Sequence, residues 1–485
     1  MQFFEILLLI ITLSLLVILS FFGRHRTLQQ RLFLIGLATL TLHILIESVR
    51  WQMSFIYFIL LISGLFYLKK SISHLLLRSF GFLMAIILVF MSVFYSLTMP
   101  ILTLNAPSGE YSVGNTIIKM LDKKREEFHT QDPKDKRELL VEIWYPAKPS
   151  LTVLPKSMWS GLYSGKSDII SYLTGYLKNV KTHSFPNLQP ADGTFPLILF
   201  NHGLQMFTSQ NTLLMEHLAS HGYIVASIGH PYESIRIDFG QDHVVLPEFV
   251  TSFKKFNEGM QWVEEASIPM TKAKEEIKFI EDREKRSKIV LDAIQKADGL
   301  NKMVTLWASD NEFVLDKLLQ NSKKKLALIP NIDSKKIGVM GMSIGGAAAG
   351  EFSKIDIRIK AGINIDGLQY GTAQMDTLKV PFMMVYSDDG QGMNDFMFLK
   401  SNQNYYEYHL KNTRHADLTD MAIIWPILKI YGQAGPLSGN RVTKIMNSII
   451  LKFWDSHLKN IPEIDLLKTS FPEIEIKSNT NYKGN

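Results

Sequence analysis

The chain has 485 residues, of which 46% are apolar and 20% charged, and its mean hydropathy is slightly positive. This length allows two or three domains, and this composition excludes a disordered chain. Because cysteine is absent, the sequence excludes a disulfide framework, a thiolate zinc site, an iron–sulfur cluster and a cysteine nucleophile.

The formal net charge of +6 lies mainly in the first 100 residues. These hold seven Lys or Arg and two acidic residues, whereas the remaining 385 residues hold 45 basic and 44 acidic side chains. A nucleic-acid-binding protein presents a concentrated basic surface, and this distribution does not supply one. The charge therefore gives no support to a nucleic-acid partner.

Four long apolar stretches occupy the N-terminal part of the chain. They are residues 6–22, 32–46, 51–68 and 80–99, and the second is the shortest. An apolar helix of about 20 residues crosses a hydrocarbon core about 30 Å thick. A signal peptide has a basic start and one apolar run, whereas here the start carries Glu5 and the runs recur. We predict four transmembrane helices over residues 1–100.

Basic residues in the short loops predict the orientation of these helices, because such loops stay on the cytoplasmic side. Arg24, Arg26 and Arg31 follow the first apolar stretch, and Lys69 and Lys70 follow the third. Both termini and everything after residue 100 are therefore predicted to lie on the extracytoplasmic side, facing a periplasm or the cell exterior.

Residues 101–470 have the sequence pattern of a globular domain in which short apolar strands alternate with helical segments. Predicted strands cover residues 138–144, 195–200, 223–228, 336–340, 361–365 and 382–386. This alternation predicts an α/β fold with a mostly parallel sheet flanked by helices. A charged helical insertion is expected at about 235–325, and a polar tail at 471–485.

A serine motif follows one of these strands. Residues 341–345 read G-M-S-I-G, an apolar strand leads in, and a helix start rich in small residues leads out. This G-x-S-x-G pattern between a strand and a helix places the serine on a sharp turn that exposes its hydroxyl. The interpretation is that Ser343 is a catalytic nucleophile.

A serine hydroxyl needs a general base, and a carboxylate must orient that base. In this type of fold the order along the chain is serine, acid, histidine, which leaves His409, His415 and His457. His409 falls in a strand-like run and His457 in a terminal helix. His415 lies in a loop after a strand, so it is the predicted base.

Chain order alone does not identify the acid. Asp366 ends one predicted strand, and Asp388 and Asp389 end the next. Both positions are at carboxyl ends of strands, where sites in open α/β sheets gather. All three aspartates remain candidates on spacing.

Acyl transfer also needs hydrogen-bond donors for the oxyanion. The backbone N–H after the nucleophile, that of Ile344, is one. A loop after an earlier strand supplies the second, and Leu204 in the sequence N-H-G-L at 201–204 is the expected residue. His202 in this loop is assigned no proton transfer.

Together these segments resemble the platelet-activating factor acetylhydrolase family and its bacterial esterase relatives within the α/β-hydrolase superfamily. The resemblance extends over most of the soluble region. It is carried by PSG at 107–109, YSVG at 111–114, REL at 137–139, IWYPA at 143–147, LFNHGL at 199–204, LASHGY at 218–223, HPY at 230–232, GMSIGGAAA at 341–349, AGINIDG at 361–367 and HADLTD at 415–420.

The resemblance implies Asp366 as the acid, a Ser343–His415–Asp366 mechanism, and N–H donors on Leu204 and Ile344. It also implies calcium-independent hydrolysis of short or oxidised acyl chains on phospholipids, with no metal or cofactor. Met342 stands where relatives often have histidine, and the helical insertion is long. These departures concern the substrate more than the reaction.

The resulting hypothesis is a membrane-anchored serine ester hydrolase acting on lipid or small acyl esters. One alternative is a general carboxylesterase or polyester hydrolase without lipid preference. The other alternative is of a different class: an inactive hydrolase-like binding module carried by a membrane protein, since fold does not imply function.

Overall fold

The computed structural model describes most of the chain. The described residues are 1–22, 25–68, 75–130, 132–165, 168–247, 268–323, 329–401, 404–462 and 464–479. They divide into two compact units. The first comprises Met1–Thr103, Ser167–Val180 and Ile424–Ile427, and the second comprises Leu104–Lys166, Lys181–Ile423 and Leu428–Asn485.

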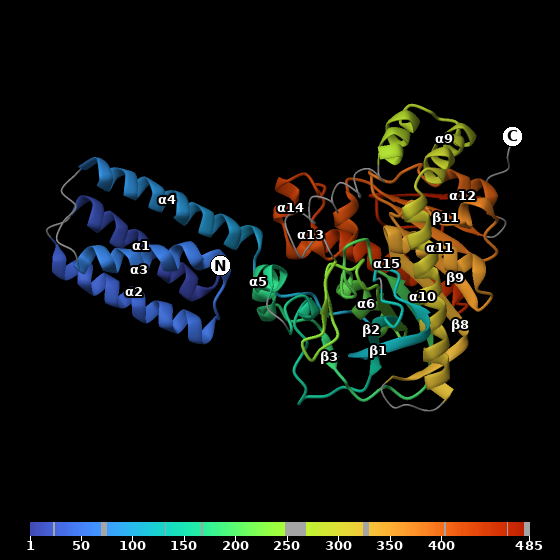
Figure 1. Ribbon diagram of the computed structural model, residues 1–485, viewed down its shortest axis with the longest axis horizontal. Coiled ribbons are helices and arrows are strands. Elements are labelled where there is room, and N and C mark those ends of the chain that lie inside the picture. Colours follow the sequence, from blue (N-terminus) through green and yellow to red (C-terminus); the bar gives the residue numbers. More distant parts are fainter. Residues whose placement is uncertain are drawn as a thin grey trace. The chain divides into compact units, whose positions relative to one another are not determined.

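Four apolar helices form most of the first unit (Figure 1). They are α1 (Phe3–Phe21), α2 (Arg26–Ile46), α3 (Ser54–Leu68) and α4 (Leu75–Thr98). Among the described residues, three helical stretches are long and apolar enough to cross a membrane: Phe3–Phe21, Arg26–Ile46 and Ser79–Thr98. The shorter apolar helix is Trp51–Gly64. The second apolar stretch was predicted to be the shortest, but in the structure the third is the shortest. The reason is that α2 begins six residues before the predicted start of the second stretch and includes polar residues there.

The first unit also contains charged side chains that are buried and paired. Arg50 Nη1 donates to Glu5 Oε1 at 2.8 Å, and Arg50 Nη2 donates to the Met99 carbonyl at 2.8 Å. His43 Nδ1 lies 3.0 Å from Glu47 Oε2. Because a charge away from water is costly unless it is paired, these contacts stabilise one particular packing of the helices.

Two segments from the later part of the chain belong to this first unit. One carries α5 (Ile169–Thr174) and the 3-10 helix η3 (Gly175–Asn179). The Trp51 indole N–H donates to the Leu173 carbonyl at 2.9 Å, and the Trp425 indole N–H donates to the Tyr176 hydroxyl at 2.9 Å. A single boundary at residue 100 therefore does not describe the division, because the chain returns to the first unit twice.

A ten-stranded sheet forms the centre of the second unit. Its order is β12-β11-β10-β9-β8-β4-β5-β2-β1-β3. The strands are β1 (Ser112–Glu126), β2 (Lys136–Ala147), β3 (Ser184–Pro186), β4 (Thr194–Asn201), β5 (Ile224–Gly229), β8 (Asn331–Met342), β9 (Ile359–Ile365), β10 (Phe382–Tyr386), β11 (Tyr405–Leu410) and β12 (Ile474–Ser478). The strands from β5 through β4, β8, β9 and β10 to β11 pair in parallel. The sheet is therefore mostly parallel, as predicted.

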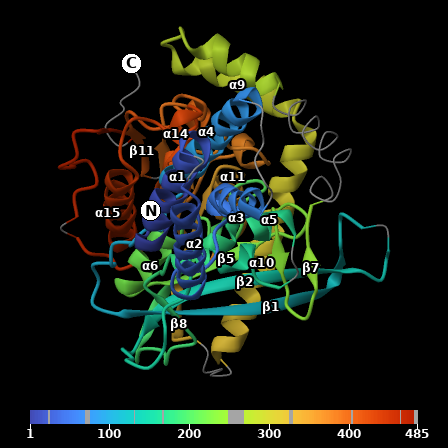
Figure 2. The ribbon, with the colours of Figure 1, turned by 90° about the vertical axis from the view of Figure 1, so that its left-hand side faces the viewer.

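Antiparallel strands complete the sheet at both ends. β2 pairs antiparallel with β5 and with β1, and Figure 2 shows β1 and β2 as a long neighbouring pair. At the other end, β12 pairs antiparallel with β11. The prediction of a polar tail at 471–485 is wrong for Ile474–Ser478, which form a strand because their backbone pairs with β11. Residues 480–485 lie outside the described part.

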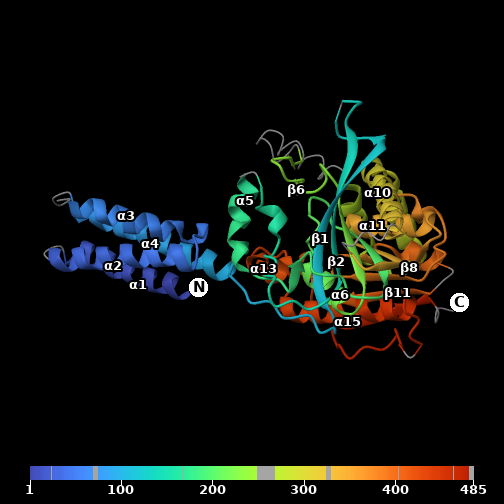
Figure 3. The same cartoon turned by 90° about the horizontal axis from the view of Figure 1, so that it is seen from below.

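Helices cover both faces of the sheet. Figure 3 shows α10 (Asp298–Lys323) and α11 (Ile344–Ile355) on one side and α6 (Thr212–Ser220) and α15 (Gly439–His457) on the other. Within β4, Leu197 and Leu199 pack in the core against α10 and α11, whereas Ile198 and Phe200 pack in the core against α6 and α15. Successive strand residues face opposite sides, so a continuous apolar run is what a strand buried on both faces requires.

The predicted insertion at 235–325 is partly described. It contains the short pair β6 (Ile237–Asp238) and β7 (Val244–Val245), a helical segment at 268–277, α9 (Arg283–Gln295) and α10. Residues 248–267, which fall within the predicted helical stretch, lie outside the described residues. Val314 and Leu318 of α10 are fully buried against the sheet, so this part of the insertion belongs to the core.

A buried ion network ties β2 to α10. Arg137 has no exposed side-chain surface, and it contacts Glu127 at 3.0 Å, Glu233 at 3.2 Å and Asp310 at 2.8 Å. Burial raises the pKa of Asp310, but the charge and hydrogen bonds of Arg137 and His230 together outweigh this effect and hold the pKa below its usual range. Asp310 and Glu233, whose pKa is also lowered, therefore stay ionised beside the Arg137 guanidinium, and Arg125 lies 2.8 Å from Asp310 as a second cation.

Replacing Arg137 with methionine is expected to reduce the free energy of unfolding by about 3–5 kcal/mol, because it removes the fully buried cation that Glu127, Glu233 and Asp310 share. Urea unfolding of the detergent-solubilised chain, followed by tryptophan fluorescence, measures this. The control is Arg358→Met: Arg358 is 31% exposed and pairs with Asp356, so its loss is expected to cost below about 1 kcal/mol. Equal effects of the two substitutions contradict the prediction.

Candidate active site

Ser343 lies on the turn between β8 and α11. Its φ is +57° and its ψ is −124°, a conformation that side chains rarely adopt. The turn is crowded: a Cβ added at Gly345 would lie 2.2 Å from the Asn201 carbonyl oxygen, and one at Gly341 would lie 2.1 Å from the Gly345 carbonyl oxygen. Both glycines of the motif are thus required by close backbone approach, and the serine is held in a strained geometry typical of functional turns.

Asp366 immediately follows β9, next to the serine turn. The Ser343 N–H donates to the carbonyl of Ile365 at 2.8 Å. Asp366 Oδ1 accepts from the Ser387 N–H at 2.8 Å, and Oδ2 accepts from the Ser387 hydroxyl at 2.7 Å. Burial raises the pKa of Asp366, but hydrogen bonding and charge from His415, together with the bonds from Ser387, bring that pKa below its ordinary value. The carboxylate is therefore ionised at neutral pH.

His415 begins the short 3-10 helix η5 (His415–Leu418), which follows β11. Its Nδ1 lies 2.7 Å from Asp366 Oδ2, and its side chain is 46% exposed. Desolvation lowers the pKa of His415, but the hydrogen bond and charge of Asp366, aided by the charge of Asp389, raise it above the ordinary value. With Nδ1 bonded to the carboxylate, Nε2 is left to exchange protons.

The other candidates have different partners. Asp388 Oδ1 lies 2.8 Å from His409 Nε2, and Asp388 Oδ2 accepts from the Asn412 N–H at 3.0 Å. Asp389 Oδ2 accepts from the backbone N–H of His415 at 3.2 Å rather than from its ring. His457 packs against Phe453 at the end of α15. The structure thus brings His415 into contact with Asp366 and bonds the Ser343 turn to the residue before Asp366, while Asp388 and His409 form a separate pair.

The two predicted oxyanion donors lie on backbone segments that contact each other. Ile344 is the first residue of α11, and the first N–H groups of a helix have no partner within it. Leu204 follows the segment 201–203, whose carbonyl groups touch the serine turn at Gly345. Within the described residues, neither N–H donates a hydrogen bond to another group of the protein. Both are free to bind a developing negative charge.

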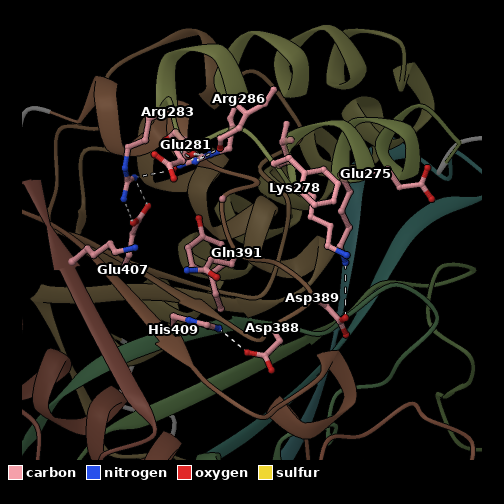
Figure 4. Close-up of a pocket in the computed structure, with 18 of the residues that line it drawn as sticks. Glu275, Lys278, Glu281, Arg283, Arg286, Asp388, Asp389, Gln391, Glu407 and His409 are labelled. Carbon is pink, nitrogen blue, oxygen red and sulfur yellow. Dashed lines mark hydrogen bonds and ion pairs between the residues drawn. The ribbon is translucent and has the colours of Figure 1, made fainter.

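Two adjoining cavities open beside His415. One, of about 450 Å³, is lined by Asp366, Gly367, Tyr370 and His415. The other, of about 930 Å³, is shown in Figure 4. Lys274, Tyr386 and Asp389 line both. The wall of the larger cavity contains the His409–Asp388 pair and the Arg283–Glu407 pair (Figure 4).

Sequence reasoning did not identify Ser387, which donates one hydrogen bond to each carboxylate oxygen of Asp366. Its only signal was its position directly after the predicted strand at 382–386. Within the described residues, no group of three or more His, Asp or Glu side chains is arranged to hold a metal ion.

The comparisons with known proteins agree with this architecture. Residues 98–469 match the family described as platelet-activating factor acetylhydrolase, isoform II. The guinea pig (Cavia porcellus) platelet-activating factor acetylhydrolase is 23% identical over 361 residues, which cover 72% of this chain and 76% of that protein. A putative phospholipase A2 of Schizosaccharomyces pombe is 21% identical over 423 residues, covering 74% and 93%.

A solved structure shares the fold. The ferulic acid esterase from Streptomyces cinnamoneus superposes with a TM-score of 0.58 at 23% sequence identity, covering 78% of this chain and 99% of that one. The predicted α/β-hydrolase fold is confirmed by this likeness, and family and fold together are those of ester hydrolases.

The environment of His415 predicts the pH dependence of activity. A general base must be neutral, so the rate is expected to fall as the pH drops through the raised pKa of His415. Replacing Asp389 with asparagine removes a negative charge that favours the protonated ring, which lowers that pKa and moves the acid limb of the kcat/KM profile to lower pH. The profile with a soluble aryl ester measures this.

Asp376→Asn is the control for this charge change, because Asp376 pairs with Lys354 and lines neither cavity. Its profile is expected to match that of the natural chain. An acid limb that stays in place in Asp389→Asn, or moves to higher pH, contradicts the electrostatic role of Asp389.

Proposed function

The chain belongs to the platelet-activating factor acetylhydrolase, isoform II, family, and on that premise we propose that it is a membrane-anchored serine ester hydrolase. The nucleophile is Ser343, the base is His415, and Asp366 orients and charges the base. The observation that carries the proposal is the 2.7 Å contact between His415 Nδ1 and Asp366 Oδ2 beside a serine held at positive φ.

The proposed reaction is acyl transfer in two steps. Ser343 Oγ attacks the ester carbonyl carbon while His415 Nε2 takes the hydroxyl proton, and the N–H groups of Leu204 and Ile344 bind the resulting oxyanion. The C–O bond to the alcohol then breaks, and His415 returns the proton to that alcohol. Water, deprotonated by His415, attacks the acyl-serine and releases the carboxylic acid and the free serine.

Among the described residues, the Ser343 hydroxyl makes no direct hydrogen bond to His415. Such contacts are often long in a free enzyme and tighten when substrate binds. The side chain of His415 is 46% exposed and lines the 450 Å³ cavity, so a substrate can approach it.

The substrate class we propose is a lipid with a short or oxidised acyl ester. The printed names of the relatives, platelet-activating factor acetylhydrolase and putative phospholipase A2, support lipid esters. The outward faces of the apolar helices support a membrane location: Leu45, Phe3 and Phe90 are 75%, 71% and 67% exposed, and hydrocarbon accommodates such surfaces better than water does. A small aromatic ester is the alternative that the ferulic acid esterase likeness suggests.

Ser343→Ala is expected to reduce kcat for ester hydrolysis by at least about 10⁴-fold, because no other group replaces the nucleophile. It is also expected to abolish covalent labelling of the membrane fraction by a fluorophosphonate probe. The control is Ser353→Ala: Ser353 is a buried serine of α11, the helix that follows Ser343, and its hydroxyl donates to the Ala349 carbonyl. This variant is expected to keep labelling.

Equal labelling of the natural chain and Ser343→Ala overturns the assignment of the nucleophile. No labelling of either, in a folded protein, favours the binding-module alternative. With an active chain, the rates for short-chain phospholipids and short-chain aryl esters decide the substrate class: a preference for the aryl ester contradicts the lipid proposal.

The orientation proposed from the loop charges places the catalytic unit on the extracytoplasmic side. Because the chain has no cysteine, Leu151→Cys, at a fully exposed position of this unit, introduces one accessible thiol. A membrane-impermeant maleimide is expected to label this variant in intact cells, and the cysteine-free natural chain is the control. Labelling only after the cells are lysed contradicts the proposed orientation.

A further inference from the structure

His202 lies two residues before the proposed oxyanion donor Leu204 and is completely buried. Its Nε2 is 3.4 Å from the backbone N–H of His230 and 2.7 Å from the Ser234 hydroxyl. A backbone N–H can only donate, so His202 Nε2 accepts from it, and the ring proton must lie on Nδ1. Burial, with the neighbouring His230, lowers the pKa of His202 to about 3, so the ring is neutral at working pH.

The Nδ1–H of His202 has one acceptor, the carbonyl of Gly203, at 2.7 Å. That carbonyl also accepts from the Met206 N–H at 3.0 Å. The Gly203 C=O and the Leu204 N–H belong to the same peptide group, and no peptide bond of the described chain is cis. In a trans peptide these two groups point in opposite directions. Holding the carbonyl toward His202 therefore turns the Leu204 N–H away from His202.

The partners of His202 are themselves fixed. The Ser234 N–H donates to the His230 carbonyl at 2.8 Å, and the Gln205 N–H donates to the Glu233 carbonyl at 2.8 Å. Glu233 is held by Arg137 and by the Trp307 indole N–H at 2.9 Å. The turn at 230–234 is therefore anchored on the buried ion network, and it presents the Ser234 hydroxyl to His202 in one place.

We propose that His202 and Ser234 are positioning residues for the oxyanion site: Ser234 keeps His202 in its Nδ1–H form, and His202 holds the Gly203 peptide so that the Leu204 N–H faces the oxyanion. This inference rests on the proposed function. Neither side chain exchanges a proton with substrate, so their contribution is made through the Leu204 N–H alone.

The effect is expected on transition-state binding rather than on substrate binding. In Ser234→Ala, kcat for a short-chain aryl ester is expected to fall about 10-fold with KM within about twofold, and in His202→Phe kcat is expected to fall about 100-fold, the range for loss of one oxyanion donor. Affinity for a trifluoromethyl ketone, whose adduct with Ser343 carries an oxyanion, is expected to fall by the same factors. The pH profile of kcat/KM is expected to stay unchanged, because His415 keeps its partners.

The matched control is Ser227→Ala, which removes a buried hydroxyl that donates to the Thr208 carbonyl outside this loop. His202→Gln, whose amide N–H can bond the Gly203 carbonyl, is expected to recover part of the rate lost in His202→Phe. Thermal unfolding identifies variants that do not fold. If the His202 variants do not fold, the kinetics of Ser234→Ala test the proposal.

Wild-type kcat and ketone affinity in Ser234→Ala, or an unchanged kcat with raised KM, overturn the positioning role. A shifted acid limb also overturns it, because the effect would then act through His415. If the natural chain hydrolyses no ester, the proposed function fails, whereas an active natural chain with unaffected variants removes only this inference.

Discussion

The close approach of two backbone segments is the constraint on which the site depends. The turn that carries Ser343 leaves no space between Gly345 and the carbonyl groups of Asn201 and His202, which lie 2.2 and 2.4 Å from the position of an added Cβ. Because β4 and β8 are parallel neighbours, their carboxyl ends bring the proposed nucleophile and the loop of Leu204 to the same edge. Any side chain at 345 would separate the serine turn from the segment that carries the proposed oxyanion donor Leu204.

The same edge explains why the acid lies where it does. β9 and β10 are the next strands in the sheet, so Asp366 and Ser387 emerge side by side beyond their ends. Chain order left Asp366, Asp388 and Asp389 open, because all three follow adjacent parallel strands. What distinguishes them is the direction of each side chain: Asp366 reaches the ring of His415, whereas Asp388 reaches His409. That direction depends on the positive φ of Asp366, which spacing does not reveal.

Sequence periodicity predicted the parts of the fold whose signal is local. The run at 195–200 is apolar throughout because both faces of β4 are covered, and the serine turn carries its own glycines. Other features depend on distant pairing. Arg137 meets Asp310 across 173 positions, α5 joins the apolar helices through Trp51, and β12 has alternating charged residues that form a strand only beside β11. The first two have no pattern that a single segment could display, and the alternation of apolar and charged residues in β12 extends over only five residues.

Two imidazoles of the site have opposite pKa shifts, and the difference follows from their surroundings. His202 is buried among neutral acceptors and donors, with His230 as a neighbouring ring, so its charged form is disfavoured. His415 loses water as well, but Asp366 and Asp389 face it, so its charged form is favoured. A neutral, fixed ring suits a residue that holds a peptide group, and a ring stabilised as imidazolium suits one that must take a proton during each step. The presence or absence of neighbouring carboxylates therefore determines which of the two histidines is stabilised in its charged form.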